Sequence, residues 1–325
     1  MSGMSASHPL VSVVVPTYNG ARFLGATLRS LGMQTYPDIE VIVVDDGSTD
    51  ETLEVARASD VPSSVVVQRN LGVAVARNRG LAHARGQWVG FVDQDDLWRR
   101  DRVQDLVDHA TAHGLRAVAS TEHEFALAAD REALRAVGDG RDLWPQEWIS
   151  EGDEDSLVNA PSRIPAGAPE LIGVERLMEG AAMLTTAVLY DRETALAAGG
   201  FAPHARALDD HILNLNVARI AGPIHRIDTR DLLYRVHAAS TSTVSPMASP
   251  MLSAMASVRL GGIFPGDRRI GPNIEHLLYA LADTGLSKTD QVALLMLTVP
   301  QGSRARWTAR WAKRMLRRAT RGGTA

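Results

Sequence analysis

The chain has 325 residues, a net charge of −4 and no cysteine, and 45% of its residues are hydrophobic. This length fits one large α/β domain or two smaller ones, and the lack of cysteine excludes disulfides, thiolate metal sites and cysteine nucleophiles. Residues 1–10 lack the basic start and apolar core of a signal peptide, and no apolar run reaches the roughly 18 residues that span a bilayer. A cytoplasmic protein is therefore expected.

Hydrophobic patterning predicts strands that alternate with helices in the first third of the chain. The expected strands are residues 10–15, 40–44, 64–67, 88–92 and 117–121. The expected helices are residues 21–33, a segment that ends near 59, then 73–84 and 100–113. The second helix is expected to start at a capping box formed by Ser48 and Glu51. Such alternation implies right-handed βαβ units and a mostly parallel sheet flanked by helices, which is the α/β class.

Polar residues follow three of these strands at the point where each strand ends. A turn over residues 16–20 follows the first strand, residues 45–50 follow the second, and Asp93, Asp95 and Asp96 follow the fourth. Because parallel strands end at one edge of a sheet, these loops are expected to meet at a crevice. Three acids there suit a hard divalent cation that bridges to a phosphate-bearing ligand. An acidic turn that caps the next helix is the alternative.

The second half of the chain is less regular. Residues 130–169 show little periodicity, and we interpret them as an insertion over the site or a mobile lid, with a disordered loop as the alternative. Residues 183–190 are a predicted strand. Helices are predicted from residue 192 and from residue 208. Further strands are expected at 224–227 and 232–237, and three or four helices beyond residue 245.

Several classes of protein lack their motifs in this chain. Neither the Gly-x-Gly-x-x-Gly turn of dinucleotide-binding dehydrogenases nor the Gly-x-x-x-x-Gly-Lys-Ser/Thr loop of P-loop nucleotidases is present. No serine lies in a Gly-x-Ser-x-Gly elbow, so a hydrolase triad has no support. The pair Asp45 and Asp46 follows the second strand, whereas the acid pair of a phospho-receiver domain follows the first.

Four stretches taken together resemble the family 2 glycosyltransferases, an inverting group with the GT-A nucleotide-diphospho-sugar transferase fold. They are residues 13–19 (Val-Val-Val-Pro-Thr-Tyr-Asn), 43–50 (Val-Val-Asp-Asp-Gly-Ser-Thr-Asp), 70–80 (Asn-Leu-Gly through Ala-Arg-Asn-Arg-Gly) and 91–96 (Phe-Val-Asp-Gln-Asp-Asp). Each stretch is a weak signal alone, but their order and spacing match the family jointly over residues 10–98.

The resemblance implies which residues bind the donor. The turn after the first strand, with the first acid pair, would hold the base and ribose of the nucleotide, and the arginine of the third stretch would lie near the donor. The expected donor contacts are Pro16, Thr17, Tyr18, Asn19, Asp45, Asp46, Arg77, Asp93 and Gln94.

The resemblance also implies a metal site. Asp93 and Asp95 match the Asp-x-Asp motif, in which the second acid reaches the metal, and Asp96 is an additional expected contact. Mg²⁺ or Mn²⁺ would take carboxylate and diphosphate oxygens together and neutralise the charge that grows on the leaving group. Residues 234–237 (Tyr-Arg-Val-His) resemble a family segment whose histidine approaches the metal, which adds His237. A structural or exposed histidine is the alternative.

The catalytic residues are expected at the start of the helix near residue 208. Residues 199–201 (Gly-Gly-Phe) resemble a family turn, and Asp209 with Asp210 occupies the place of the family's Glu-Asp pair, although the first acid departs from Glu. We expect Asp210 to be the general base, with Asp209 beside it, because inversion needs a carboxylate within reach of the acceptor hydroxyl. A role as helix caps is the alternative.

The resemblance therefore implies an inverting glycosyltransferase. It would move a sugar from a nucleotide-diphospho-sugar, with uridine as the favoured base, to a hydroxyl of a glycan or lipid-linked acceptor, as in cell-envelope polysaccharide synthesis. The catalytic domain is expected over residues 8–240 and a helical extension over 241–325. The alternatives are a nucleotidyltransferase on a related fold and a non-catalytic nucleotide-sugar binding protein. The second is favoured only if Asp209 and Asp210 lie far from the metal site.

The end of the chain differs in charge from the rest. Residues 304–325 hold eight basic side chains and no acid, which leaves 26 basic against 38 acidic side chains in the remaining chain. Trp307, Trp311 and Met315 recur every fourth residue, so on a helix they form one apolar stripe with arginines beside it. This pattern over residues 304–321 favours peripheral binding to an anionic membrane surface, and packing of the stripe on the catalytic domain is the alternative. Nucleic acid binding is not expected, because the acidic remainder would repel phosphate backbones.

Overall fold

The computed structural model describes residues 8–137, 145–165, 167–179, 182–203 and 209–240, together with Ala309 and Ala312. The predicted helical extension and its basic tail lie outside these residues, apart from those two alanines, which are helical. Ala312 packs against the hydrophobic core. Within the described part of the chain, no helix is long and apolar enough to cross a membrane.

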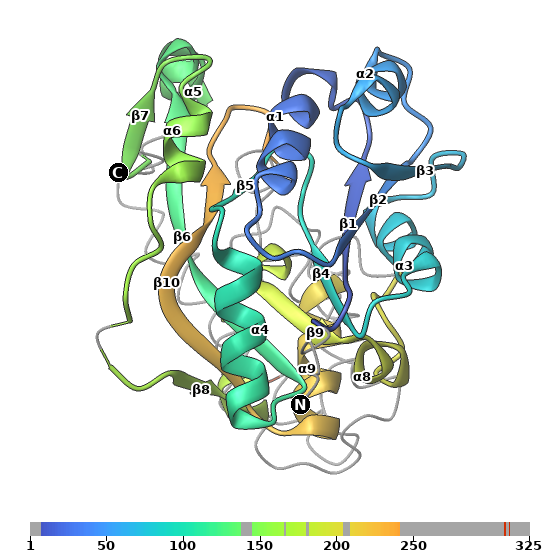
Figure 1. The fold of residues 1–325 in the computed structure, drawn as a ribbon, viewed down its shortest axis with the longest axis vertical. Coiled ribbons are helices and arrows are strands. Elements are labelled where there is room, and N and C mark those ends of the chain that lie inside the picture. Colours follow the sequence, from blue (N-terminus) through green and yellow to red (C-terminus); the bar gives the residue numbers. More distant parts are fainter. Residues whose placement is uncertain are drawn as a thin grey trace, which may run out of the picture.

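Helices and strands alternate through the described residues, as Figure 1 shows. The strands are β1 Val11–Thr17, β2 Ile39–Asp45, β3 Ser63–Val67, β4 Trp88–Phe91, β5 Leu97–Trp98, β6 Ala117–Leu127, β7 Glu147–Ile149, β8 Glu170–Ile172, β9 Val188–Asp191 and β10 Ile224–Arg235. The helices are α1 Ala21–Gly32, α2 Thr52–Ala58, α3 Val73–His83, α4 Arg102–His113, α5 Arg131–Val137, α6 Glu154–Asn159, α7 Val174–Glu179, α8 Arg192–Ala197 and α9 Asp209–Ala221. Two 3₁₀ turns, η1 Ala128–Asp130 and η2 Thr185–Ala187, complete the described elements.

The strands form one mixed sheet. Its order is β3-β2-β1-β4-β9-β6-β10-β5, and β7 pairs with β6 while β8 pairs with β10. The first four of these strands are parallel, as the alternation of strands and helices predicts. Strand β9 runs antiparallel to both of its neighbours, β4 and β6. The sheet is therefore a parallel half joined to a second half through one reversed strand.

Alternating side chains of the strands build a core on each face of the sheet. In β1, Val13 and Val15 join one hydrophobic cluster and Val14 joins the other, as the two-residue period of a strand requires. Helices α1, α2 and α4 cover the first face, and α4 lies across the front of Figure 1. Helices α3, α7, α8 and α9 cover the second. The result is a three-layer α/β arrangement that matches the predicted class.

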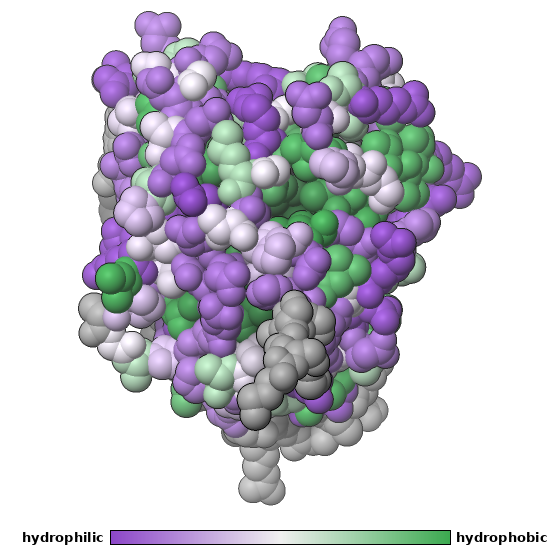
Figure 2. Space-filling model, viewed as in Figure 1, coloured by the Kyte–Doolittle hydropathy of each residue, from purple (hydrophilic) through white to green (hydrophobic). Residues whose placement is uncertain are grey.

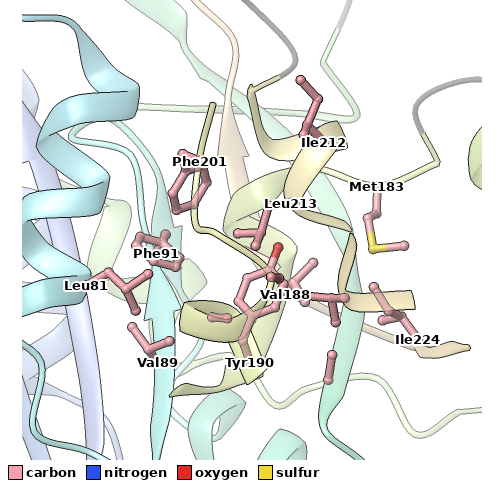
Figure 3. Close-up of a cluster of buried hydrophobic side chains, with 14 of the residues drawn as sticks. Leu81, Val89, Phe91, Met183, Val188, Tyr190, Phe201, Ile212, Leu213 and Ile224 are labelled. Atoms are coloured by element: carbon pink, nitrogen blue, oxygen red, sulfur yellow. The ribbon is translucent and has the colours of Figure 1, made fainter. Parts of the chain in front are cut away.

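The core on the second face reaches the carboxyl half of the chain. Figure 3 shows Phe91 of β4 beside Phe201 and Tyr190, and ring centroids of 4.7 Å to Phe201 and 6.2 Å to Tyr190 place the three in edge contact. Such pairs add roughly 0.5–1.5 kcal/mol beyond the area they bury. This packing brings the turn at residue 201 against the strand that leads to Asp93.

The structure differs from the sequence expectations at several elements. The predicted capping box is wrong: Glu51 holds the N-cap position of α2, and the Ser48 hydroxyl bonds to Asp45 instead. Strand β1 continues through Pro16 to Thr17, although proline was expected to end it. The two strands predicted over 224–237 form the single strand β10, with a register shift between Ile227 and Leu232. The short strands β5, β7 and β8 and helix α7 were not expected.

The segment predicted as irregular carries regular structure. It contains α5 and, among residues 145–165, β7 and α6. Strand β7 extends the sheet beside β6, and Leu157 and Val158 of α6 join a hydrophobic cluster with Phe125 and Leu233. The described part of this segment is therefore packed on the domain, and disorder is ruled out for it.

Candidate active site

The carboxyl ends of β1, β2 and β4 lie side by side and lead into three loops. The parallel register aligns Thr17 of β1 with Asp45 of β2, and Val14 of β1 with Phe91 of β4. The loops are residues 18–20, 46–50 and 92–96. They start from one edge of the sheet, where ligands bind in open α/β sheets. The predicted meeting of the three loops is confirmed.

The side chain of Gln94 joins the first loop to the third. Its Oε1 accepts hydrogen bonds from the Thr17 hydroxyl at 2.7 Å and the Tyr18 backbone N–H at 2.8 Å, and its Nε2 donates to the Tyr18 carbonyl at 3.2 Å. Gly20 permits this approach, because a Cβ there would lie 2.2 Å from Gln94 Oε1. Gln94, an expected donor contact, thus shapes the turn, and Tyr18 stays 44% exposed beside it.

Asn19 ties the first loop to the second. It adopts a positive φ of 48°, its backbone N–H donates to the Ser48 hydroxyl at 3.0 Å, and its side-chain oxygen accepts from the Thr49 N–H at 2.8 Å. Ser48 in turn donates its hydroxyl to Asp45. Pro16, the remaining expected contact in the turn, is the penultimate residue of β1. Asn19 and Asp45 therefore belong to one hydrogen-bond network that runs through Ser48.

Asp46 is buried and organises a further loop. Its Oδ1 accepts from Gln68 Nε2 at 2.7 Å and from the Leu71 N–H at 2.8 Å, and its Oδ2 accepts from the Gly72 N–H at 2.8 Å. These bonds fix the connection between β3 and α3 and thereby the position of the start of α3 beside the site. Asp46 was expected to contact the nucleotide-sugar. In the structure both of its carboxylate oxygens accept hydrogen bonds from the protein itself. Figure 2 shows an apolar area over β3, and Val67 and Leu71 are each 46% exposed.

Arg77 of α3 bridges two carboxylates from distant parts of the chain. Its Nη2 donates to Asp93 Oδ1 at 2.7 Å and its Nη1 donates to Asp209 Oδ2 at 3.1 Å. Its guanidinium also lies over the Phe201 ring, 5.4 Å from the centroid. Burial opposes the charged form, but Asp93 and Asp209 outweigh it and hold the pKa of Arg77 above its usual value. Arg77 is thus a fixed cation between the two acidic clusters.

Asp95 faces the histidine that the sequence singled out. Its Oδ2 lies 2.8 Å from His237 Nε2, and its side chain is 23% exposed. Asp96 turns inward instead: it is 1% exposed, and its Oδ1 accepts from the Arg235 N–H at 3.0 Å. Burial, with Asp95 and Asp93 nearby, raises the pKa of the Asp96 carboxyl well above its ordinary value. The three acids therefore have three different environments.

Asp95 and His237 fit a divalent cation as a pair. A carboxylate oxygen and an imidazole nitrogen this close can turn toward one ion, and both are ligands that Mn²⁺ accepts. Asp93 is held by Arg77, and Asp96 is held by the Arg235 backbone. Among the described residues, no three His, Asp or Glu side chains are arranged to hold a metal ion by themselves. A metal here would take further ligands from diphosphate oxygens and water.

Asp209 and Asp210 start α9 and differ in exposure. Asp209 is 4% exposed and paired with Arg77. Burial and the neighbouring Asp210 raise the pKa of Asp209 to about 6, against the opposing effect of Arg77. Asp210 is partly exposed, and its Oδ1 accepts from the His211 N–H at 2.7 Å. Its charge acts on both Arg77 and Asp93. The pair is therefore adjacent to the acids that follow β4.

Asn78 was quoted in the sequence motif but given no role. It forms two hydrogen bonds of 2.8 Å with the backbone of Phe201, donating to the carbonyl and accepting from the N–H. Gly200 has a φ of 66°, and a Cβ there would lie 2.4 Å from Asn78 Oδ1. Gly200 thus allows Asn78 to approach and hold the Gly-Gly-Phe turn. Asn78 directly follows Arg77, whose side chain points into the site. An amide at this position is the sequence signal that could have identified the role of Asn78.

Comparison with known proteins assigns the first part of the chain. Residues 12–126 match the family model described as glycosyl transferase family 2. The match covers about a third of the chain, and we call residues 12–126 the family 2 region. TuaG of Bacillus subtilis (strain 168), a proposed teichuronic acid biosynthesis glycosyltransferase, is 39% identical over 104 residues, which are 31% of this chain and 41% of TuaG. The chain thus matches about two-fifths of that relative's length.

Solved structures share the fold of most of this chain. S. aureus TarS 1-349 in complex with UDP-GlcNAc has a TM-score of 0.55 and 19% identity, and the match covers 89% of this chain and 71% of that one. The mannosyltransferase PcManGT of Pyrobaculum calidifontis, in complex with GDP-Man and Mn²⁺, has a TM-score of 0.55 and 20% identity over 96% of this chain and 81% of its own. At such identities the likeness concerns the fold alone, and it confirms the predicted class.

Proposed function

We propose that this protein is an inverting glycosyltransferase that moves a sugar from a nucleotide-diphospho-sugar to an acceptor hydroxyl. The observation that carries the proposal is the bridge from Asp209 through Arg77 to Asp93. It joins the candidate base pair of α9 to the acids that follow β4. The residues that match the family model, 12–126, include the acids that follow β4 but end before α9. A binding protein without catalysis was favoured only if the two groups lay far apart, so the bridge argues against it.

The proposed reaction is a single in-line displacement. Asp210 takes the proton of the acceptor hydroxyl, the acceptor oxygen bonds to the anomeric carbon, and the bond from that carbon to the diphosphate oxygen breaks. Asp210 is the better base of the pair because Asp209 is buried and already paired with Arg77. A positioned carboxylate typically contributes about 10²–10⁴-fold to the rate.

The donor is proposed to lie across the edge of β1, β2 and β4. The exposed ring of Tyr18 is available to stack on the base, and the loops fixed by Gln94, Asn19 and Asp46 form the floor beneath the ribose. Arg77 holds Asp93 beside the sugar and diphosphate. UDP-GlcNAc in TarS and GDP-Man in PcManGT are nucleotide sugars bound to proteins of this fold. A uridine nucleotide remains our favoured donor.

A divalent cation, Mn²⁺ or Mg²⁺, is proposed as the cofactor. Asp95 and His237 would hold it, and Asp93 and Asp96 would stay with Arg77 and the Arg235 backbone. When bound, such an ion neutralises charge on the departing nucleoside diphosphate. PcManGT was solved with Mn²⁺, which supports the choice of ion.

The acceptor is proposed to be a glycan or a lipid-linked saccharide. The basic tail over residues 304–321 would then hold the protein at an anionic membrane surface, on the inner face, near such an acceptor. This part of the proposal rests on the charge and apolar spacing of the sequence.

Product analysis tests the proposed reaction. The purified protein is first screened by thermal shift against nucleoside diphosphates and their sugars with and without Mn²⁺, since a ligand at a hundred times its dissociation constant stabilises by about 2.7 kcal/mol. The donor so identified is then incubated with candidate acceptors. Release of nucleoside diphosphate with an inverted anomeric centre supports the proposal. Release of pyrophosphate from a nucleoside triphosphate would instead indicate a nucleotidyltransferase, and binding without turnover would indicate a binding protein.

A further inference from the structure

Arg235 forms hydrogen bonds with the loop of residues 93–96. Its Nε donates to the Asp95 carbonyl at 2.8 Å, and its backbone N–H donates to Asp96 Oδ1 at 3.0 Å. Two donors of one residue thus hold the backbone and the side chain of two neighbouring acids. The Arg235 side chain is 0% exposed, so it touches no substrate.

Two aromatic rings fix the plane of this guanidinium. The Arg235 Cζ lies 4.8 Å from the centroid of Phe23 in α1 and 4.7 Å from that of Phe125 in β6. Phe23 also contacts the ring of His237, with centroids 4.9 Å apart. One packed unit therefore touches both candidate metal ligands, Asp95 through its carbonyl and His237 through its ring.

The partner of Arg235 comes from the segment that the sequence left irregular. Glu154, at the start of α6, places Oε1 3.5 Å from Arg235 Nη1, and its side chain is 9% exposed. Its Oε2 accepts from the Gly152 N–H at 2.9 Å, so both carboxylate oxygens are engaged.

The other end of α6 is bound to the chain that follows the acid loop. Arg99 Nη1 donates to the Leu157 carbonyl at 2.7 Å, and the Arg100 N–H donates to the Val158 carbonyl at 3.0 Å. Helix α6 is therefore held at its start by Arg235 and at its end by the residues after β5. The loop of residues 93–96 is hydrogen-bonded to Arg235 of the first attachment and comes just before Arg99 and Arg100 of the second along the chain.

We propose that Glu154 and Arg235 are a positioning pair that sets the geometry of Asp95 and His237 for metal-dependent binding of the donor diphosphate. Glu154 orients the guanidinium, and the guanidinium fixes the acid loop. The inference deepens the proposed function and rests on it for the identity of the ligand.

The test measures Mn²⁺-dependent binding of UDP by calorimetry, alongside kcat and KM. Glu154→Gln keeps the size of the side chain and removes its charge. Residues that orient metal ligands typically cost about 10–100-fold in metal affinity or activity when changed, so we expect a loss of that size in the Mn²⁺-dependent part of UDP binding. UDP binding without metal should stay as in the wild type. The control is Asp155→Asn, which alters a half-exposed acid on the same helix and should change neither.

A second variant separates positioning from folding. Arg235→Lys keeps the charge but loses the planar fork, so it should show the same metal-dependent loss while thermal unfolding reports the folded fraction. In the double variant Glu154→Gln with Arg235→Lys, the loss should be no greater than in either single variant, because the pair acts as one unit.

Two results would overturn the inference. One is Glu154→Gln binding Mn²⁺ and UDP as the Asp155→Asn control does. The other is an equal loss of UDP binding with and without metal, which would mean a general disturbance of the fold. A wild type that binds UDP with Mn²⁺ but transfers no sugar would refute the proposed reaction and leave the positioning pair standing on its binding data.

Discussion

Arg77 shows how one side chain can decide the roles of several others. It forms ion pairs with Asp209 and Asp93 together, so Asp210 is left as the acid of the α9 pair without an ion pair among the described residues. The same bridge gives Asp209 a cationic partner at the position where the resemblance implies Glu.

Replacing Asp210 with Asn tests the base. The variant keeps the shape of the side chain but cannot accept the acceptor proton, so turnover should fall by about 10²-fold or more. Donor affinity should stay close to that of the wild type, because Asp210 is not expected to touch the nucleotide. Initial rates and UDP-sugar titrations measure the two quantities. A larger loss in Asp209→Asn than in Asp210→Asn would reverse the assignment within the pair.

Replacing Asp95 with Asn tests the metal site. The amide removes the negative charge that faces His237 and should abolish both transfer and Mn²⁺-dependent binding of nucleoside diphosphate, with thermal unfolding unchanged. The exposed Asp60, remote from these acids in sequence, provides the control substitution Asp60→Asn. Transfer by the wild type in excess chelator, or an active Asp95→Asn, would show that no metal is needed.

At the scale of residues, the sequence predicts which acids line the site but not which partner each of them contacts. Asp93, Asp95 and Asp96 look alike in the chain, yet one binds Arg77, one faces His237 and one is buried under Arg235. Their partners come from about 16 to 142 positions away. Only the packed structure brings such pairs together, and no local pattern encodes them.

Between α4 and β10 the packing of two elements creates a cluster of histidines. His109 and His113 stack one turn apart on α4 with ring centroids 4.3 Å apart, and His109 Nε2 lies 3.4 Å from His225 Nδ1. Burial first, and then the neighbouring imidazoles, lower the pKa of His109 and of His225 below the ordinary value of 6.5. At these two histidines, the unfolded chain therefore binds more protons than the folded protein below pH 6.5.

The sign of the pH dependence follows from that difference. The contribution of these two histidines to stability should be at its full value above about pH 6.5 and should fall as the pH drops below it. The double variant His109→Gln with His225→Gln should reduce the fall in thermal midpoint between pH 7.5 and pH 5.5. His211 is also buried, and burial lowers its pKa. Its contribution should therefore preserve part of the fall in the double variant. The exposed His83 gives the control His83→Gln. An unchanged fall in the double variant would show that the cluster carries no such linkage.

At the scale of elements, periodicity predicts the parallel half of the fold well. Apart from β5 and the start of α2, each strand and helix through α4 lies within about two residues of its predicted bounds, because these elements are long and strongly patterned. The short strands β5, β7 and β8 could not be predicted, since two or three residues carry no period and pair only because β6 and β10 offer free edges. The Ser48 capping box failed because the Asp45 carboxylate accepts the hydrogen bond of the Ser48 hydroxyl instead.

For the whole molecule, the separation of charge along the chain leads to a prediction about location. Intact protein should float with liposomes that contain anionic lipid, and flotation should weaken as salt is raised, because eight basic side chains lie within residues 304–325. Protein that lacks residues 304–325 should stay unbound and keep its UDP affinity. Equal flotation of both forms, or none of the intact protein, would favour the alternative in which the stripe packs on the domain.

The reversed strand β9 has a consequence for how the protein is made. Strands β4 and β6 are not neighbours, and they are joined only when β9, about 97 residues after β4, enters between them. Until the ribosome has delivered that strand, the newly made family 2 region has two unpaired strand edges, which are sites of misassembly. Late arrival of a central strand also makes folding slow, because distant segments must meet. Residues 12–126 are therefore a poor unit for transplantation: a chimaera that is to fold needs to carry its sequence through β9.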